Sequence, residues 1–142
     1  MESAFWDSSS LVPICVQQNA TSVAEALNKR YGMAVWWAAP VEIRGALARL
    51  VRMGLLMPNG QVQAQIVMEN LRQDWHEILP NPEVRERAER YVDRFPLKAA
   101  DALQLAASVA WSAGRPRGRV FISGDRQLLE AARELGFKAI EA

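Results

Sequence analysis

Short apolar runs separated by helical patterns are the feature that most constrains how this chain folds. Ser3–Trp6, Met33–Trp37 and Arg119–Ile122 are rich in β-branched or aromatic residues, and each is followed by a turn or a helix-start signal. Strands that alternate with helices favour a parallel sheet covered on both faces. The sequence therefore predicts an α/β fold of three layers, with a parallel central sheet between two layers of helices.

Cap residues, prolines and glycines mark the ends of the expected helices. The stretch 21–32 begins at a cap residue and ends at a glycine, and 39–54 has a proline in its first turn. Apolar residues keep helical spacing over 61–79, until Pro80 and Pro82 end the pattern and a further helix begins. The segments 97–114 and 126–136 are also expected to be helical, and Phe137–Ile140 is expected to form a last strand.

Length and composition indicate one globular domain spanning residues 1–142. No apolar run approaches the roughly 20 residues of a membrane helix, and the N-terminus lacks a basic start followed by an apolar core, so we expect a cytoplasmic protein. The single cysteine, Cys15, excludes an internal disulfide and a cysteine metal motif. Because the net charge is only +1, any binding to nucleic acid must depend on a local patch.

Four acidic residues occupy positions that suit a common site. Asp7 follows the first predicted strand, Glu42 lies in the first turn of the helix after the second, and Asp125 follows the third across one glycine. In open parallel sheets the site lies outside the carboxyl ends of the strands. Asp101 instead begins a strongly apolar helix, where an acid costs free energy unless it is paired, hydrogen-bonded or bound to a metal.

Each acid also has a purely structural interpretation. Asp7 and Asp125 suit helix caps, and Glu42 and Asp101 suit first-turn acids favoured by the helix dipole. Four unrelated caps need not face one cleft, however. Carboxylates brought together repel unless a cation neutralises them, and Mg²⁺ or Mn²⁺ prefers such oxygen ligands. The pattern therefore indicates metal-assisted hydrolysis at phosphorus.

The motifs "FWDSSSLV", "PVEIRGAL", "LKAADALQLA" and "VFISGDRQLLEAARELGF" resemble the successive acidic motifs of PIN-domain ribonucleases, especially the VapC toxins of toxin–antitoxin systems. The resemblance runs from the first strand to the last. It implies a PIN-like fold and a metal-dependent endoribonuclease that hydrolyses RNA phosphodiester bonds. It also implies a cognate antitoxin as a partner and a homodimer.

The resemblance implies that Asp7, Glu42, Asp101 and Asp125 form the catalytic site and bind Mg²⁺ or Mn²⁺. Asp7 and Asp101 are the expected direct ligands, whereas Glu42 and Asp125 are expected to act directly or through water. Ser9 and Ser123 are expected to provide polar support.

Two positions depart from the family's pattern. Many relatives place a serine or threonine shortly before the glutamate, but this chain has "VWWAAPVE", so polar support from that strand is not expected. Gln104 stands where similar proteins often carry histidine, and the sequence assigns it no catalytic role.

Among the cations, Lys98 and Arg126 are best placed to contact a substrate phosphate, and Arg44 is a weaker candidate. The run 114–119, "GRPRGR", precedes the strand whose far end carries Asp125, so we interpret it as a solvated turn. His76 is the only histidine and lies within the predicted helix 61–79, away from the acids. A serine hydrolase is excluded, since a triad needs an aligned imidazole.

Two other functions stay open at this point. The chain could be a non-catalytic PIN-like module that binds a protein partner, or a receiver domain, which shares an acidic pocket and Mg²⁺. Five tryptophans and the apolar helices between Thr21 and Leu71 independently favour a homodimer surface or a groove for a partner.

Overall fold

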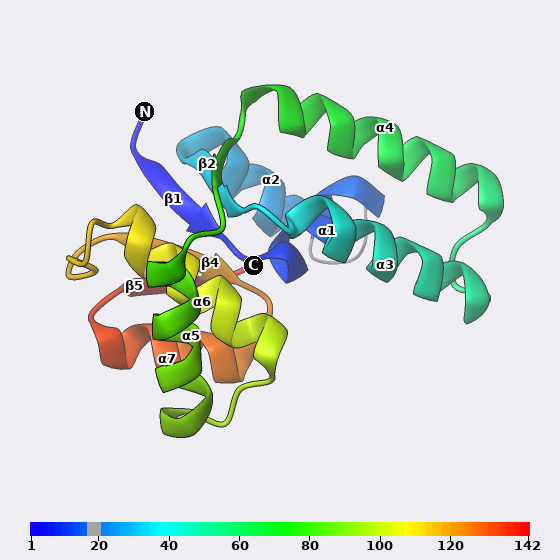
Figure 1. Cartoon of the computed structure of the whole chain (residues 1–142). Coiled ribbons are helices and arrows are strands. Elements are labelled where there is room, and N and C mark those ends of the chain that lie inside the picture. Colours follow the sequence, from blue (N-terminus) through cyan, green and yellow to red (C-terminus); the bar gives the residue numbers. More distant parts are fainter. Residues whose placement is uncertain (17–20) are drawn as a thin grey trace.

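A computed structural model describes residues 1–16 and 21–142, and within these residues the chain forms one parallel sheet of five strands with helices on both faces (Figure 1). The strand order is β3-β2-β1-β4-β5. All four neighbouring pairs are parallel. The strands are β1 (Ser3–Trp6), β2 (Gly32–Trp36), β3 (His76–Ile78), β4 (Val120–Ser123) and β5 (Lys138–Glu141).

The helices divide into two groups, one on each side of the sheet. One group is α1 (Ser8–Val16), α2 (Thr21–Arg30), α3 (Ala39–Arg52) and α4 (Pro58–Asp74); the other is α5 (Pro82–Arg94), α6 (Ala99–Trp111) and α7 (Arg126–Leu135). Within the first group, α3 and α4 lie side by side and extend beyond the sheet (Figure 1). The expected three-layer α/β architecture is confirmed.

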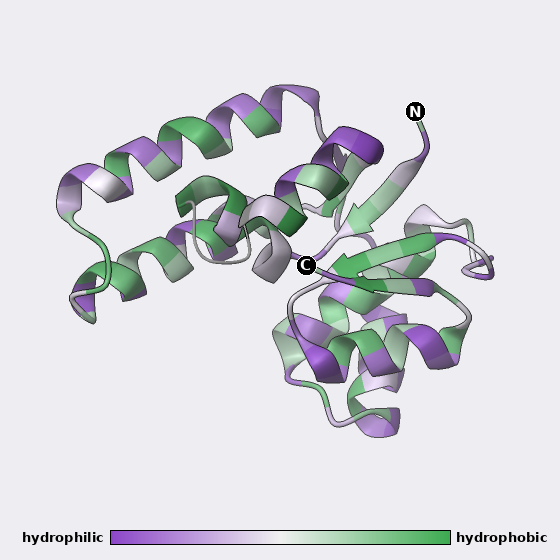
Figure 2. Ribbon diagram, turned by 180° about the vertical axis from the view of Figure 1, so that it is seen from behind, coloured by the Kyte–Doolittle hydropathy of each residue, from purple (hydrophilic) through white to green (hydrophobic). Residues whose placement is uncertain are grey.

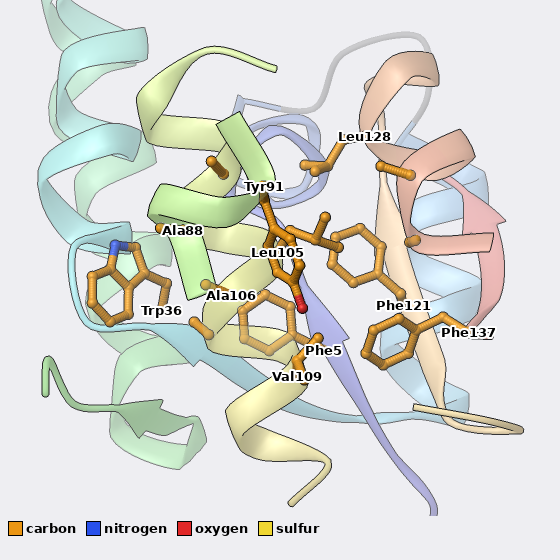
Figure 3. Close-up of a cluster of buried hydrophobic side chains, with 14 of the residues drawn as sticks. Phe5, Trp36, Ala88, Tyr91, Leu105, Ala106, Val109, Phe121, Leu128 and Phe137 are labelled. Carbon is orange, nitrogen blue, oxygen red and sulfur yellow. The ribbon is translucent and has the colours of Figure 1, made fainter. Parts of the chain in front are cut away.

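Alternation along the strands produces one core on each face of the sheet. In β1, Phe5 faces α5, α6 and α7, whereas its neighbours Ala4 and Trp6 face the first group of helices. Figure 3 shows the first of these cores, where the ring of Phe121 lies 5.7 Å from Phe5 and 5.6 Å from Phe137, measured between centroids. Figure 2 shows the matching pattern, with hydrophobic residues along the central strands and alternating residue types along α4 and α7.

The predicted helix over 61–79 is wrong at both ends. Helix α4 begins at Pro58 and ends at Asp74, and His76–Ile78 form the edge strand β3, paired with β2. Trp75 leaves the helix with an extended backbone, and its buried indole donates a hydrogen bond to Glu77. A strand of three residues is too short to show a period of two, so the apolar spacing of Trp75 and Ile78 imitates a helix. His76 is exposed on this strand.

Strand order separates this fold from that of a receiver domain. Receiver domains have the order 2-1-3-4-5, whereas here β1 lies between β2 and β4, in the order 3-2-1-4-5. The receiver alternative is therefore excluded. The reversal of strand order also places a crevice outside the carboxyl ends of β1 and β4, where open α/β sheets bind their ligands.

Crossing a bilayer takes a helix of roughly 20 predominantly apolar residues, and this bears on the helices of residues 1–16 and 21–142. None of them is both long and apolar enough to cross a membrane.

Candidate acidic site

A cleft of about 220 Å³ lies at the carboxyl edge of the sheet, and all four predicted acids line it. Asp7 follows β1 and Asp125 follows β4, while Glu42 and Asp101 lie in the first turns of α3 and α6. The full lining is Asp7, Ser8, Ser9, Val12, Glu42, Ala46, Asp101 and Asp125. Residues separated by more than a hundred positions therefore meet at the strand-order reversal.

A larger hollow of about 460 Å³ lies at the opposite, amino edge of the sheet, between Tyr31 and Trp75. Asp74 is the one acid in its lining. Cavity size alone would not select the acidic cleft, because this hollow is larger, but the grouping of carboxylates does.

Asp7 is the most constrained of the acids. Its backbone N–H donates to the Ile122 carbonyl at 2.9 Å, and its own carbonyl accepts the Ser10 hydroxyl at 2.6 Å. Only 4 % of the residue is exposed. Its Oδ2 accepts the hydroxyls of Ser9 and of Ser123, the latter at 2.8 Å. The carboxylate caps no backbone N–H among the residues described, so its position is not that of a simple helix cap.

Burial raises the pKa of Asp7 to about 6, although the hydrogen bonds from Ser9 and Ser123 oppose the shift. The negative charges of Asp101 and Glu42 add to it. The cleft therefore concentrates negative charge in a poorly solvated place, which is the situation that a bound cation relieves.

Glu42 is held by two residues whose part the sequence did not predict. Its Oε1 accepts the Ser8 hydroxyl at 2.9 Å and the Gln104 side-chain amide at 2.6 Å. Burial raises the pKa of Glu42, and Asp101 raises it further, while these two donors lower it. Ser8 directly follows Asp7, and Gln104 lies one helical turn after Asp101, so both are close in sequence to a predicted acid, although nothing local pairs either of them with Glu42.

Asp125 is both a helix cap and a part of the cleft. Its Oδ1 accepts the backbone N–H groups of Gln127 at 2.9 Å and Leu128 at 3.2 Å, at the start of α7. Its own N–H donates to the Ser123 hydroxyl at 3.0 Å. The capping interpretation is thus correct for this residue, yet it does not exclude a site, because Asp125 also lines the cleft.

Asp101 differs from the other three acids. It is partly exposed, and its carboxylate makes no hydrogen bond or ion pair with any residue in the described ranges. Partial burial and the charge of Asp125 raise its pKa, whereas Lys98 lowers it. Asp101 is consequently a charged group in the cleft without a fixed partner.

Ser9, Ser123 and Gly124 form a compact support beside Asp7. The hydroxyl oxygens of the two serines lie 3.3 Å apart, and the Gly124 N–H donates to Ser9 Oγ at 3.0 Å. A Cβ on Gly124 would lie 3.2 Å from the Ala142 carbonyl oxygen and 3.5 Å from Ser9 Oγ. The glycine between Ser123 and Asp125 thus permits this close approach.

The donor set fits a hard divalent cation, because it consists of carboxylates and hydroxyls. In residues 1–16 and 21–142, however, no three or more acidic, histidine or cysteine side chains are gathered closely enough to hold an ion together. Mg²⁺ normally keeps several waters and uses one or two carboxylates, so the two observations are compatible.

The other predicted residues lie around the site or away from it. Lys98 and Arg126 are exposed at the starts of α6 and α7, near Asp101 and Asp125 respectively. Arg44 forms an ion pair with Glu69 at 3.6 Å, on the side of α4. Within the basic turn 114–119, the Arg119 guanidinium lies over the Trp111 ring at 4.1 Å, at the amino end of β4 and away from the cleft.

The tryptophans at the end of β2 face different surroundings. Trp36 is 6 % exposed and belongs to the core, whereas Trp37 is 51 % exposed. The two rings meet edge to face at 6.5 Å.

Comparison with known proteins gives similarity of structure but not of sequence. No family model and no curated protein matches the chain. Among solved structures, PAE2754 from Pyrobaculum aerophilum is 21 % identical with a TM-score of 0.67, covering 99 % of this chain and 83 % of that one.

Two further structures come from toxin–antitoxin systems. A toxin–antitoxin complex from Klebsiella pneumoniae has 16 % identity and a TM-score of 0.61, over 87 % of each chain. VapBC2 from Rickettsia felis, bound to a DNA fragment from its promoter, has 9 % identity and a TM-score of 0.65, over 96 % of this chain and 97 % of that one. The chain therefore has a three-layer PIN-like fold, shared with structures of toxin–antitoxin systems.

Proposed function

We propose that this chain is a Mg²⁺- or Mn²⁺-dependent endoribonuclease, the toxin of a VapC-type toxin–antitoxin pair. The observation that carries the proposal is the meeting of four carboxylates from four separate parts of the chain in one cleft of a PIN-like fold. The likeness to toxin–antitoxin structures supports the family part of the proposal.

In this proposal Asp7 and Asp101 bind the ion, and Glu42 and Asp125 bind it directly or through water. A bound divalent ion supplies activation of water and stabilisation of negative charge on a phosphate. Ser9 and Ser123 hold Asp7 in place through its Oδ2. Lys98 and Arg126 provide positive charge beside the cleft for the phosphates of the RNA substrate.

Cleavage of labelled RNAs by the purified chain tests the proposal, with Mg²⁺ or Mn²⁺ and with a chelator. Asp101→Asn and Asp93→Asn, purified in the same way, provide the variant and its matched control, because Asp93 is exposed on α5 outside the cleft. We expect metal-stimulated cleavage by the parent and by Asp93→Asn, and little by Asp101→Asn. Absence of cleavage across varied RNAs would instead favour the non-catalytic binding module.

The proposed partners are a cognate antitoxin and a second copy of the chain. Apolar side chains on the outer side of the molecule support such contacts, since Trp37, Val62 and Ile66 are each at least half exposed. Light scattering at micromolar concentration should give twice the chain mass. A monomer over a wide concentration range would contradict the homodimer.

A further inference from the structure

Gln104 connects three helices beneath the acidic cleft. It lies on α6 and is 1 % exposed. Its Nε2 donates to Glu42 Oε1 on α3 at 2.6 Å and to Ser8 Oγ on α1 at 2.8 Å. Ser8 in turn donates to the same Glu42 oxygen at 2.9 Å. The three side chains thus form a closed triangle of hydrogen bonds.

The direction of these bonds follows from the chemistry of the groups. A carboxylate accepts only, so both groups that touch Glu42 Oε1 must donate. Because Ser8 Oγ accepts one amide hydrogen of Gln104, its own hydroxyl proton is left to point at Glu42. If the Gln104 amide were turned over, its Oε1 would face the Glu42 Oε1, and two acceptor oxygens would repel each other. Gln104 therefore donates to Glu42 directly and also orients the second donor.

Stability alone does not explain an amide at this position. Gln104 Oε1 is buried and finds no hydrogen-bond partner in the described part of the chain. A buried acceptor without a partner costs about 1–3 kcal/mol, and an apolar side chain of the same shape would avoid that cost. The Gln104 side chain is thus explained by the hydrogen bond that it donates to Glu42, and not by a gain in the stability of the core.

Ser8 and Gln104 are the two donors that support Glu42 in the described residues. The segment before it, "VWWAAPV", carries no side-chain hydroxyl, and within residues 1–16 and 21–142 no third donor reaches the carboxylate. Both donors bind Oε1, so Oε2 is left without a protein partner among those residues. A carboxylate fixed through one oxygen keeps the other for a ligand in the cleft.

We propose that Gln104 is a positioning residue, which fixes the Glu42 carboxylate for a divalent cation in the cleft. The inference rests on the proposed function for the presence of the cation, and it adds a residue for which the sequence indicated no role. Gln104 contacts neither the cation nor the RNA in this account, and it acts only through Glu42.

Mn²⁺ affinity measured by calorimetry tests the inference, together with thermal unfolding of the metal-free protein. Gln104→Met keeps the shape and removes the donor, whereas Gln104→His keeps a ring N–H donor. Gln73→Met makes the same chemical change at an exposed position on α4. We expect Gln104→Met to weaken Mn²⁺ binding about 10- to 100-fold, as loss of a ligand's hydrogen-bond partner typically does. Its metal-free melting temperature should not fall.

Gln104→His should recover most of the affinity, and Gln73→Met should behave as the parent does. A double-mutant cycle adds a result that a merely structural role would not give. Once Glu42→Gln is present, adding Gln104→Met should cause no further loss of Mn²⁺ affinity. High Mn²⁺ concentration should also restore RNA cleavage by Gln104→Met.

Three results would overturn the inference. They are parent-like Mn²⁺ affinity in Gln104→Met, equal additional loss in the Glu42→Gln background, and a large drop in metal-free stability for both Gln104 variants. A parent that binds Mn²⁺ but cleaves no RNA contradicts the proposed nuclease, yet the affinity comparison still decides the role of Gln104. A parent that binds no Mn²⁺ overturns both proposals.

Discussion

Three carboxylates of the cleft are held by the protein, and the fourth is not. In Asp7, Glu42 and Asp125 one oxygen accepts two hydrogen bonds, from a serine pair, from a serine and an amide, and from two backbone N–H groups respectively. In each of them the other oxygen has no such partner in the described residues. Asp101 has no hydrogen bond through either oxygen within those residues, although it stands among the other charges.

Under the proposed function, the difference separates two ways of preparing a cation site. The held carboxylates offer ligand oxygens whose positions are set before any ion binds, which reduces the ordering that binding requires. The Asp101 side chain is free to rotate toward a bound ion and to complete the coordination of that ion. In the proposal, this division accounts for acids that share a cleft but, within residues 1–16 and 21–142, are not gathered into a finished metal centre.

Asp7→Asn should have the largest effect on activity. The substitution preserves size but removes the charge of the most buried acid, and with it a ligand. We expect RNA cleavage to fall more than about 100-fold, beyond the 10- to 100-fold effect typical of residues that only support a ligand. Cleavage assays at saturating Mn²⁺ measure this loss, and Asp93→Asn is the control. Retention of parent-like cleavage would remove Asp7 from the site.

Asp101→Asn sharpens the comparison, because it should separate activity from stability. Removing a charge that has no fixed partner lowers the repulsion in the cleft, so the metal-free variant should melt at the same temperature as the parent or higher. Mn²⁺ should stabilise the variant much less than the parent, and cleavage should fall steeply. Thermal melts with and without Mn²⁺, beside a cleavage assay, test this.

Two results for Asp101→Asn would contradict the account. A melting temperature far below that of the metal-free parent would make Asp101 a structural hydrogen-bonding residue. Full metal stabilisation together with full activity would show that Asp101 does not belong to the site.

The change in the free energy of unfolding with pH should be a smaller effect than those of the two substitutions, and its direction follows from the pKa of Asp7. The pKa of Asp7 is raised to about 6 in the folded protein, against an ordinary value of about 3.9 in the unfolded chain. The folded state therefore binds the proton more tightly than the unfolded chain does. The free energy of unfolding of the metal-free protein should decrease as the pH rises from about 4 to about 6. The share of Asp7 is at most roughly 3 kcal/mol, since each pKa unit corresponds to about 1.4 kcal/mol.

Burial raises the pKa of Glu42 and Asp101 as well, so both act in the same direction. Urea unfolding of metal-free protein across this pH range measures the effect, with Asp7→Asn as the comparison. The difference in unfolding free energy between variant and parent should grow as pH rises to about 6 and then level off. A constant difference would show that Asp7 titrates in the folded protein as it does in the unfolded chain.

Strands β1, β2 and β4 and the positions of the acids could be predicted from the sequence because each has a strong local signal. The ends of β1, β2 and β4 lie within one residue of the predicted runs, since aromatic and β-branched residues are concentrated there. Asp7, Glu42 and Asp125 follow directly from the rule that sites form at the carboxyl ends of parallel strands.

The strand β3 and the partners of Glu42 could not be predicted, for different physical reasons. Strand β3 is defined by its pairing with β2, which is a tertiary interaction, while its three residues carry no period of their own. Ser8 and Gln104 lie 34 and 62 positions from Glu42, and nothing local marks a serine or glutamine as the donor to one distant carboxylate.

A crystal structure of the chain grown with Mn²⁺ tests the central claim most directly, because anomalous scattering locates the ion. We predict an anomalous peak in the cleft, within bonding distance of Asp7 and with Asp101 rotated toward it, while the hydrogen bonds to Asp7 Oδ2 and Glu42 Oε1 are kept. No peak in the cleft at Mn²⁺ concentrations that stabilise the protein in solution, or a peak bound to other residues, would contradict the account.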